Sequence, residues 1–210
     1  SGKSTIGEIV GGLQEPTHGN VFYYGRNIKE LSEEEYRDYR KSVQFIFQDP
    51  KGSMDPNYKI DHILSMPLLT TNIAGNKNEA EKIIDEMLIR VGLDLSIKNK
   101  YPSEISGGQC QRAAIARALM VKPKLIVCDE PVSALDVSIQ AQILNLLREL
   151  QRELSISYIF ISHDIGVVNY MSDTILVMSN GAIVERGEAK EVLLNPKEKY
   201  TKKLIESAFM

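Results

Sequence analysis

Short apolar runs alternate with helical patterns along this chain, and such alternation is typical of a parallel sheet covered by helices. After the last run, Asn180 and Gly181 tolerate the positive φ of a tight turn, which predicts a hairpin between residues 176 and 184. The fold class is therefore predicted to be α/β with a mainly parallel sheet. The runs predict strands at 43–47, 125–128, 158–161 and 175–178.

Helical patterns occupy much of the remaining chain. Apolar residues recur at helical spacing from 139 to 154, and a second helix is predicted from about 77 to 91. Ser32 and Glu35 have the spacing of a capping box, so a short helix is expected to begin there. Between 48 and 123 no convincing strand pattern occurs. This block is interpreted as a helical insert in an α/β core.

The composition is that of an ordinary globular domain. The 210 residues are 43% hydrophobic, with 25 basic and 28 acidic residues and a net charge of −3. Binding to nucleic acid rests mainly on clustered Lys and Arg, so no nucleic-acid partner is expected. No apolar run approaches the roughly 18 residues that span a bilayer. Cys110 and Cys128 are too few for a disulfide framework or a zinc site and are interpreted as reduced structural thiols.

Gly2, Lys3 and Ser4 match the end of the phosphate-binding loop G-x-x-x-x-G-K-[ST]. In that loop, backbone N–H groups and a helix N-terminus hold phosphate oxygens. Lys3 would reach the β and γ phosphates, and the hydroxyl of Ser4 would bind Mg²⁺. A Gly-Lys-Ser sequence also arises by chance, so this motif alone leaves the function open.

An apolar strand beginning at residue 125 ends in two carboxylates, Asp129 and Glu130. A carboxylate at a strand end beside a phosphate-binding loop can hold Mg²⁺, and a second one can activate an attacking water. Asp129 suits the metal and Glu130 suits the water. Taken alone, an acidic turn after a buried strand is the alternative explanation.

The sequence Ile-Ser-Gly-Gly-Gln at 105–109, ahead of a helix with Arg112 and Arg117, closely resembles the signature of ATP-binding cassette (ABC) ATPases. Two glycines at a helix N-terminus let exposed N–H groups and the Ser106 hydroxyl approach a γ phosphate closely. The resemblance covers almost the whole chain. It implies a P-loop NTPase (RecA-like) core with a helical signature subdomain.

The resemblance assigns roles at further positions. Gln48 matches the glutamine loop and would sense Mg²⁺ and water, and His163 matches the switch histidine that would contact the γ phosphate. Residues 133–136 match the D-loop, whereas His18 and His62 match no motif and are expected on the surface. The residues so implied are Glu130, His163 and Gln48 for catalysis, Gly2, Lys3, Ser4, Thr5, Ser106, Gly107, Gly108, Gln109 and Asp136 for nucleotide binding, and Ser4, Gln48 and Asp129 for Mg²⁺.

Two segments, 48–56 and 195–204, resemble one branch of the family, the oligopeptide and dipeptide importers. The resemblance also implies that the first half of the phosphate-binding loop, the strand before it and the adenine-stacking aromatic residue lie upstream of Ser1. The chain would divide into an ATP-binding core of residues 1–48 and 121–187, a helical signature subdomain of residues 49–120 and a C-terminal helical tail of residues 188–210.

The implied function is that of an ATP-hydrolysing subunit that binds ATP and Mg²⁺ and powers an importer of peptides. Its partners would be a second ATPase subunit, of the same or a different chain, and two transmembrane permease subunits. An extracellular solute-binding protein would act indirectly, and the subunit would lie at the cytoplasmic face of the cell membrane. The alternatives are an importer of nickel or metal chelates, since other subunits choose the cargo, a soluble ABC ATPase without a channel, and a non-hydrolysing cassette.

Overall fold

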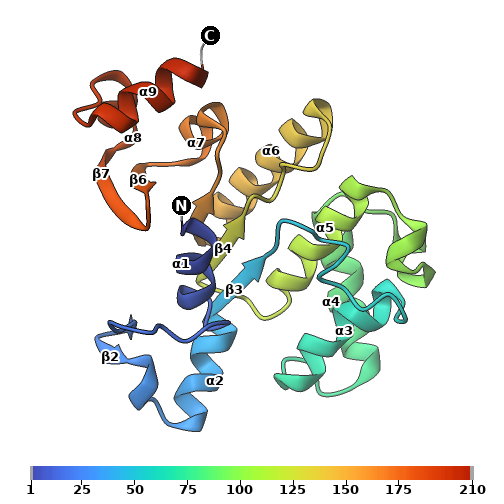
Figure 1. Ribbon diagram of the computed structural model, residues 1–210. Coiled ribbons are helices and arrows are strands. Elements are labelled where there is room, and N and C mark those ends of the chain that lie inside the picture. Colours follow the sequence, from blue (N-terminus) through green and yellow to red (C-terminus); the bar gives the residue numbers. More distant parts are fainter. Residues whose placement is uncertain (1, 209–210) are drawn as a thin grey trace.

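The structure of the protein is a computed structural model that describes residues 2–208. At its centre lies a three-stranded parallel sheet in the order β3–β4–β5 (Figure 1). The register pairs Val43 with Leu125 and Leu125 with Ser157. The predicted strands are confirmed here, with ends that differ by a single residue. The strands are β3 Val43–Ile46, β4 Leu125–Asp129 and β5 Ser157–Ile161.

Strand β4 is buried because helices cover both faces of the sheet. Ile126 and Cys128 lie in a large apolar cluster with residues of α5 and α6, and Val127 lies in a second cluster with Ile161. Helix α1 packs on the second face, where a Cβ on Gly7 would lie 2.8 Å from Cδ1 of Ile161. A larger residue at this position would push the helix off the sheet. The helices are α1 Lys3–Val10, α5 Gly107–Leu119 and α6 Val137–Leu154.

Residues 48–123, all within the described part of the chain, contain helices and turns and no strand. Leu64, Leu88 and Ile115 are fully buried between these helices. The helical interpretation of this block is confirmed, and Cys110 lies inside it as a buried free thiol. Besides α5, the block contains the helices α3 Ile60–Thr70 and α4 Lys77–Arg90 and the short 3₁₀ turns η2 Leu95–Asn99 and η3 Pro102–Glu104.

A small unit between α1 and the sheet contains a hairpin that the sequence did not predict. Its two-residue turn consists of Tyr24 at φ 47° and Gly25 at φ 80°. The helix predicted after it is confirmed, with a complete capping box between Ser32 and Glu35. The elements are β1 Phe22–Tyr23, β2 Arg26–Asn27, the 3₁₀ turn η1 Ile28–Glu30 and α2 Glu33–Ser42.

The C-terminal part carries the second predicted hairpin. Asn180 at φ 48° and Gly181 at φ 78° form its turn, as expected from the sequence. Strand β6 pairs antiparallel with β7 in a separate two-stranded sheet, so the strand predicted near 175 lies outside the parallel sheet. The elements are α7 Ile165–Met171, β6 Thr174–Ser179, β7 Ala182–Glu188, α8 Ala189–Leu194 and α9 Lys199–Ala208.

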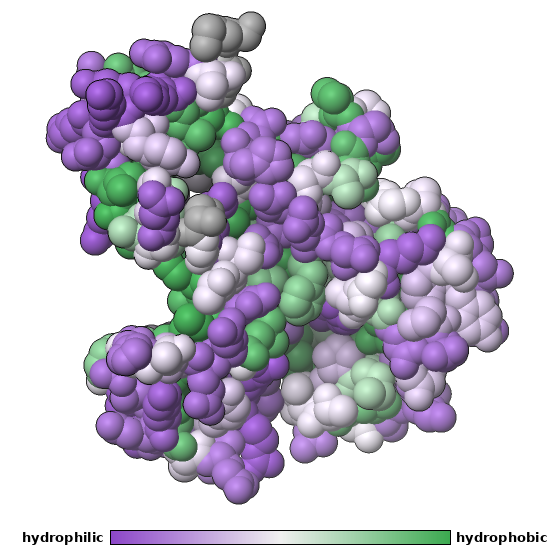
Figure 2. Space-filling view, viewed as in Figure 1, coloured by the Kyte–Doolittle hydropathy of each residue, from purple (hydrophilic) through white to green (hydrophobic). Residues whose placement is uncertain are grey.

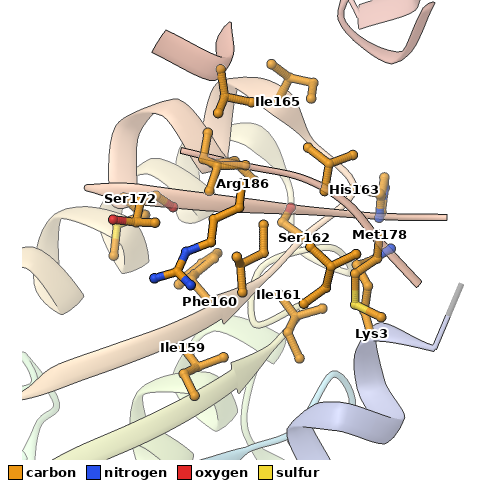
Figure 3. A pocket seen from close by; sticks show the side chains of 18 of the residues that line it. Lys3, Ile159, Phe160, Ile161, Ser162, His163, Ile165, Ser172, Met178 and Arg186 are labelled. Carbon is orange, nitrogen blue, oxygen red and sulfur yellow. The ribbon is translucent and has the colours of Figure 1, made fainter. Parts of the chain in front are cut away.

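A cavity of about 900 Å³ lies between β5 and the β6–β7 sheet. Ile159 and Ile161 of β5 line one side of it, and Lys3, His163 and Met178 gather at one end (Figure 3). On the surface, the molecule is hollowed between the lobe that carries β6 and β7 and the lobe that carries β1 and α2 (Figure 2). In the part of the chain that the structure describes, no helix is both long and apolar enough to cross a membrane.

Candidate functional site

The carboxyl ends of the three parallel strands bring Gln48, Glu130 and His163 together. Gln48 follows β3, Glu130 follows β4 directly, and His163 follows β5. Nδ1 of His163 lies 2.9 Å from Oε1 of Glu130, and Nε2 of Gln48 donates to Oε2 of Glu130 at 3.2 Å. Three residues that are distant in the sequence thus meet at the edge where α/β sheets bind their ligands.

The carboxylate of Glu130 has a partner at each oxygen. Its side chain is 19% exposed, whereas that of His163 is 68% exposed. A carboxylate fixed in this way, with an imidazole at hydrogen-bond distance, can accept a proton from a water and share it with the ring. The site has the geometry of a general base with an orienting partner.

Ser4 and Asp129 form a second contact beside this group. The Ser4 hydroxyl donates to Oδ1 of Asp129 at 3.2 Å, across 125 positions of sequence. Burial raises the pKa of the Asp129 carboxyl, and the bond from Ser4 acts in the opposite direction. A buried carboxylate beside a hydroxyl is stabilised by a bound cation.

The donor set at Ser4 and Asp129 fits Mg²⁺, which takes oxygen ligands and keeps several from water or phosphate. Among residues 2–208, no group of three or more His, Cys, Asp or Glu side chains could hold a metal ion by itself. An ion at this position would therefore take its remaining ligands from a bound phosphate group and water.

Helix α1 begins beside this pair of side chains. Gly2 precedes the helix at φ 87°, a left-handed conformation that favours glycine, and its carbonyl accepts from Ile6 N at 3.1 Å. The first helical residues, Lys3, Ser4 and Thr5, follow immediately. The N–H groups of a first helical turn can hold phosphate oxygens, and Lys3 adds a positive charge there.

The signature residues 106–109 form the N-terminus of α5. Ser106 caps the helix by accepting from Gln109 N at 3.2 Å, and the Gln109 side chain accepts from Ser106 N at 3.0 Å. A Cβ on Gly107 would be 3.5 Å from Cδ2 of Leu135. A Cβ on Gly108 would lie 2.8 Å from Cγ2 of Ile139, so this glycine also serves the packing of α5 on α6.

The structure does not bring the signature to the other predicted residues. In the part of the chain described, no hydrogen bond joins Ser106–Gln109 to Ser4, Gln48, Glu130 or His163. Asp136 is likewise engaged locally. It caps α6 by accepting from Ile139 N at 3.0 Å, and that bond is the main cause of the lowered pKa of its carboxyl.

Ser133 belongs to the site, although sequence reasoning gave it no role of its own. Its hydroxyl donates to the Glu130 carbonyl at 3.1 Å, and Nε2 of Gln48 lies 3.5 Å from the same hydroxyl. The signal that could have identified it is its place three residues after Glu130, within one tight turn. His18 and His62 are exposed and stand apart from the site, as expected.

Comparison with known families agrees with a site that could bind phosphate groups and Mg²⁺. The sequence model of the family described as ABC transporter matches residues 1–133 of the chain. The chain belongs to this family.

Relatives of this ABC transporter protein carry names from peptide transport. The oligopeptide transport ATP-binding protein OppF of Salmonella typhimurium is 48% identical over 204 residues, which are 97% of this chain and 61% of the relative. AppF of Bacillus subtilis, another oligopeptide transport ATP-binding protein, is 46% identical over 98% of this chain and 63% of its own length. The chain thus spans somewhat less than two thirds of the length of these relatives.

Solved structures of the same family share the fold. The dimeric structure of the ATP-binding cassette MJ0796 in a post-hydrolysis state with ADP and Pi has a TM-score of 0.79 at 30% identity, covering 90% of this chain and 81% of that one. The structure of cbiO1 from Clostridium perfringens, part of the ABC transporter complex cbiONQ, has a TM-score of 0.78 at 31% identity over 92% of this chain and 75% of that one.

Proposed function

We propose that this chain is the ATP-binding and ATP-hydrolysing subunit that powers an importer of oligopeptides or dipeptides. The observation that carries the proposal is Glu130, whose carboxylate lies between Gln48 and His163 beside the Ser4–Asp129 pair. Peptide cargo is supported by the relatives OppF and AppF, whose names refer to oligopeptide transport.

In this mechanism, Lys3 and the N–H groups at the start of α1 bind the β and γ phosphates of ATP. Ser4 and Asp129, assisted by Gln48, would hold Mg²⁺, which would supply positive charge to neutralise the phosphate groups. Glu130 accepts the proton of the attacking water at its carboxylate. His163 holds Glu130 through the 2.9 Å contact and contacts the γ phosphate. This order of events produces ADP and inorganic phosphate.

A second ATPase subunit would complete the site. Within the described part of one chain, no hydrogen bond joins Ser106–Gln109 to Glu130, which supports a head-to-tail pair in which the signature of one subunit closes over the ATP of the other. The dimeric form of MJ0796 with ADP and Pi is consistent with such a pair. Asp136, adjacent to exposed Val137, would lie at the same interface.

The remaining partners would be two transmembrane permease subunits, with a solute-binding protein outside the cell, so that the chain works at the cytoplasmic face of the membrane. A groove of about 430 Å³ between the sheet and the helical block offers a docking surface, lined among others by Phe47, Tyr58 and Met66. Phe47 in its lining directly precedes Gln48, and this proximity supports a coupling between ATP hydrolysis at the site and movement of the permease subunits.

The division of the chain follows from the same proposal. Residues 1–48 and 121–187 would form the ATP-binding core, residues 49–120 the signature subdomain and residues 188–210 the tail, of which the last two residues lie outside the described part. Residues 48–123 contain helices and turns and no strand, which supports the assignment of residues 49–120 to one helical segment.

The test is steady-state phosphate release by the intact protein, together with an ATP-binding measurement, for wild type and Glu130→Gln. Loss of a general base typically lowers turnover by roughly 10²- to 10⁴-fold, so E130Q is expected to bind ATP normally and to hydrolyse it at most at about 1% of the wild-type rate. Wild-type turnover in E130Q would remove Glu130 from the role. For cargo, cells lacking the gene are expected to lose uptake of a labelled oligopeptide and to keep uptake of nickel.

A further inference from the structure

Arg117 on α5 holds the segment that follows Gln48. Its Nη1 donates to the carbonyl of Ser53 at 2.6 Å, and its Nη2 donates to the Ser53 hydroxyl at 3.2 Å. Burial lowers the pKa of the Arg117 guanidinium, and no carboxylate among residues 2–208 lies within 4.0 Å of it. A buried cation needs hydrogen-bond acceptors, and here both acceptors belong to one residue.

The segment that Arg117 holds is a closed turn. Oδ1 of Asp49 accepts from the N–H groups of Lys51 and Gly52, each at 3.0 Å. The N–H of Ser53 donates to the Asp49 carbonyl at 3.1 Å, and its hydroxyl donates to the Pro50 carbonyl at 2.8 Å. A Cβ on Gly52 would lie 2.5 Å from Oδ2 of Asp49, so a larger residue here would displace the carboxylate that closes the turn. These bonds make residues 49–53 a unit that moves as one.

Gln48 is attached to the start of this turn. Strand β3 ends at Ile46, and the exposed Gln48 side chain contacts Glu130 at 3.2 Å and Ser133 at 3.5 Å. The position of the Gln48 amide is therefore set by β3 on one side and by the anchored Ser53 on the other.

The same helix that anchors the turn also carries the signature. Helix α5 begins after Ser106, and Arg117 lies eleven positions further along. At 1.5 Å per residue the two are about 16 Å apart along the helix axis. A helix of this length is stiff, so a displacement at the Ser106 end carries Arg117 and the turn with it.

We propose that Arg117 is a positioning residue, whose two hydrogen bonds to Ser53 fix the Gln48 amide against Glu130 and join the Gln48 turn to the signature helix. The proposal rests on the function proposed above. It implies that contact between the signature of this chain and a partner subunit changes the position of Gln48 in the same chain, through helix α5.

The discriminating variant is Arg117→Lys, which keeps the positive charge but cannot donate in a planar fork to two acceptors. Arg112→Lys is the matched control on the same helix. Arg112 donates to the Val91 carbonyl at 2.7 Å and to Oε1 of Gln142 at 3.2 Å, and neither hydrogen bond involves residues 48–53. Ser53→Ala is the second variant, since it deletes the hydroxyl acceptor of Arg117, together with the hydroxyl's bond to the Pro50 carbonyl, and keeps the carbonyl acceptor and Arg117 in place.

Hydrogen exchange gives a readout that does not depend on ATP hydrolysis. Loss of a hydrogen bond from a charged donor shifts a local opening equilibrium by about tenfold or more. We expect the amides of residues 51–53 to exchange about tenfold faster in R117K than in wild type, and S53A to move in the same direction. R112K is expected to leave them unchanged. Unchanged exchange in both R117K and S53A would overturn the proposal.

Kinetics tests the link to Gln48. R117K is expected to lower kcat by about tenfold with unchanged ATP affinity, where kcat is counted per folded chain that binds ATP, so that a loss of folded protein does not enter the value. Because Arg117 acts through Gln48, R117K should have no further effect in a Gln48→Ala background. Additive effects in this double variant, or an equal loss of kcat in R112K, would overturn the proposal. A wild-type protein that does not hydrolyse ATP would instead reject the proposed function, and exchange would still decide the anchoring.

Discussion

At Glu130 the backbone takes φ 45°, in the left-handed region that residues other than glycine rarely adopt. Its N–H donates to the Ile161 carbonyl of β5 at 3.0 Å, and its carboxylate has Gln48 and His163 as partners. Strained backbone of this kind persists where surrounding contacts determine it, and it clusters at functional sites. The strain here places a carboxylate at the end of the central strand.

The residue beside it gives the first prediction, for Asp129→Asn. Burial raises the pKa of the Asp129 carboxyl, so the ionised form is disfavoured in the folded chain and costs stability above that pKa. Asn keeps an acceptor for Ser4 and removes the charge. Without nucleotide at pH 7, D129N is expected to have a higher melting temperature than wild type. The expected increase is about 2–4 °C for each kcal/mol gained in the free energy of unfolding. The difference should shrink as the pH falls from the raised pKa and vanish below the ordinary Asp pKa near 4. A lower melting temperature for D129N at pH 7 would contradict this reasoning.

At the scale of elements, helix α5 packs against the core from Gly108 onwards, and the residues at its N-terminus are exposed. Ser106 and Gly107 are exposed, whereas the residues after Gln109 are largely buried in the core. The capping box satisfies N–H groups at the helix start, and the exposed end is free to meet another molecule.

Ser106→Arg is therefore expected to block ATP-dependent dimerisation and to leave ATP binding to one chain largely intact. A long cationic side chain at this point prevents close approach of a phosphate group, and loss of the cap costs about 1 kcal/mol of stability. Light scattering with ATP, in an E130Q background, reports the dimer. Ser103→Arg is the control, because Ser103 is exposed and lies just before the signature. A normal ATP-dependent dimer of S106R would exclude the signature from the interface.

The C-terminal helix α9 is fixed through a buried carboxylate on β7. Glu185 accepts from Lys197 N at 2.8 Å and from Glu198 N at 3.1 Å, and the bond from Lys197 is the main cause of its lowered pKa. A lowered pKa means that the contact stabilises the fold at neutral pH and is lost as pH falls through that pKa.

Glu185→Gln should therefore loosen the C-terminal tail at pH 7, because one end of the new side chain would set an N–H donor against a backbone N–H. We expect lower protection against hydrogen exchange in residues 195–204 of E185Q at pH 7, and in wild type, relative to the intrinsic exchange rate at each pH, when the pH falls below the ordinary Glu range near 4. Glu188→Gln serves as control, since the Glu188 side chain makes no cap bond to α8. Equal exchange of the tail in E185Q and E188Q would refute the assigned anchor.

At the scale of the whole molecule, the parallel sheet and the β6–β7 sheet enclose the apolar cavity of about 900 Å³. Strand β5 stands at the edge of its sheet, and its residues Ile159 and Phe160 are only partly buried.

The 210-residue chain is expected to bind the aromatic rings of an amphipathic dye such as anilinonaphthalene sulfonate at this cavity, because its lining is mostly apolar. Ile159→Glu should lower the bound fluorescence severalfold, because a carboxylate on the wall disfavours apolar contact. Ile89→Glu is the control, since Ile89 is 65% exposed and lies on α4, away from the cavity. Dye fluorescence that falls equally in both variants would locate the binding elsewhere.

The sequence by itself determined the elements whose pattern is local. The strands at 43–47 and 125–128 and the capped helix after Ser32 were predictable because apolar spacing and capping chemistry act within a few residues. The hairpin at Tyr24–Gly25 was not predictable in the same way, since its strands are two residues long and a tyrosine occupies a left-handed position.

The tertiary structure decided which of the predicted residues meet. Gln48 and His163 lie 82 and 33 positions from Glu130, and nothing in the spacing reveals that their side chains share one carboxylate. Strand pairing of β3, β4 and β5 brings these loops to one edge of the sheet. The anchoring of Ser53 by Arg117 crosses 64 positions and involves a backbone carbonyl, which carries no sequence signal. Contacts between residues that are distant in the sequence depend on how whole helices and strands pack. The local sequence pattern does not determine that packing, so it could not predict these contacts.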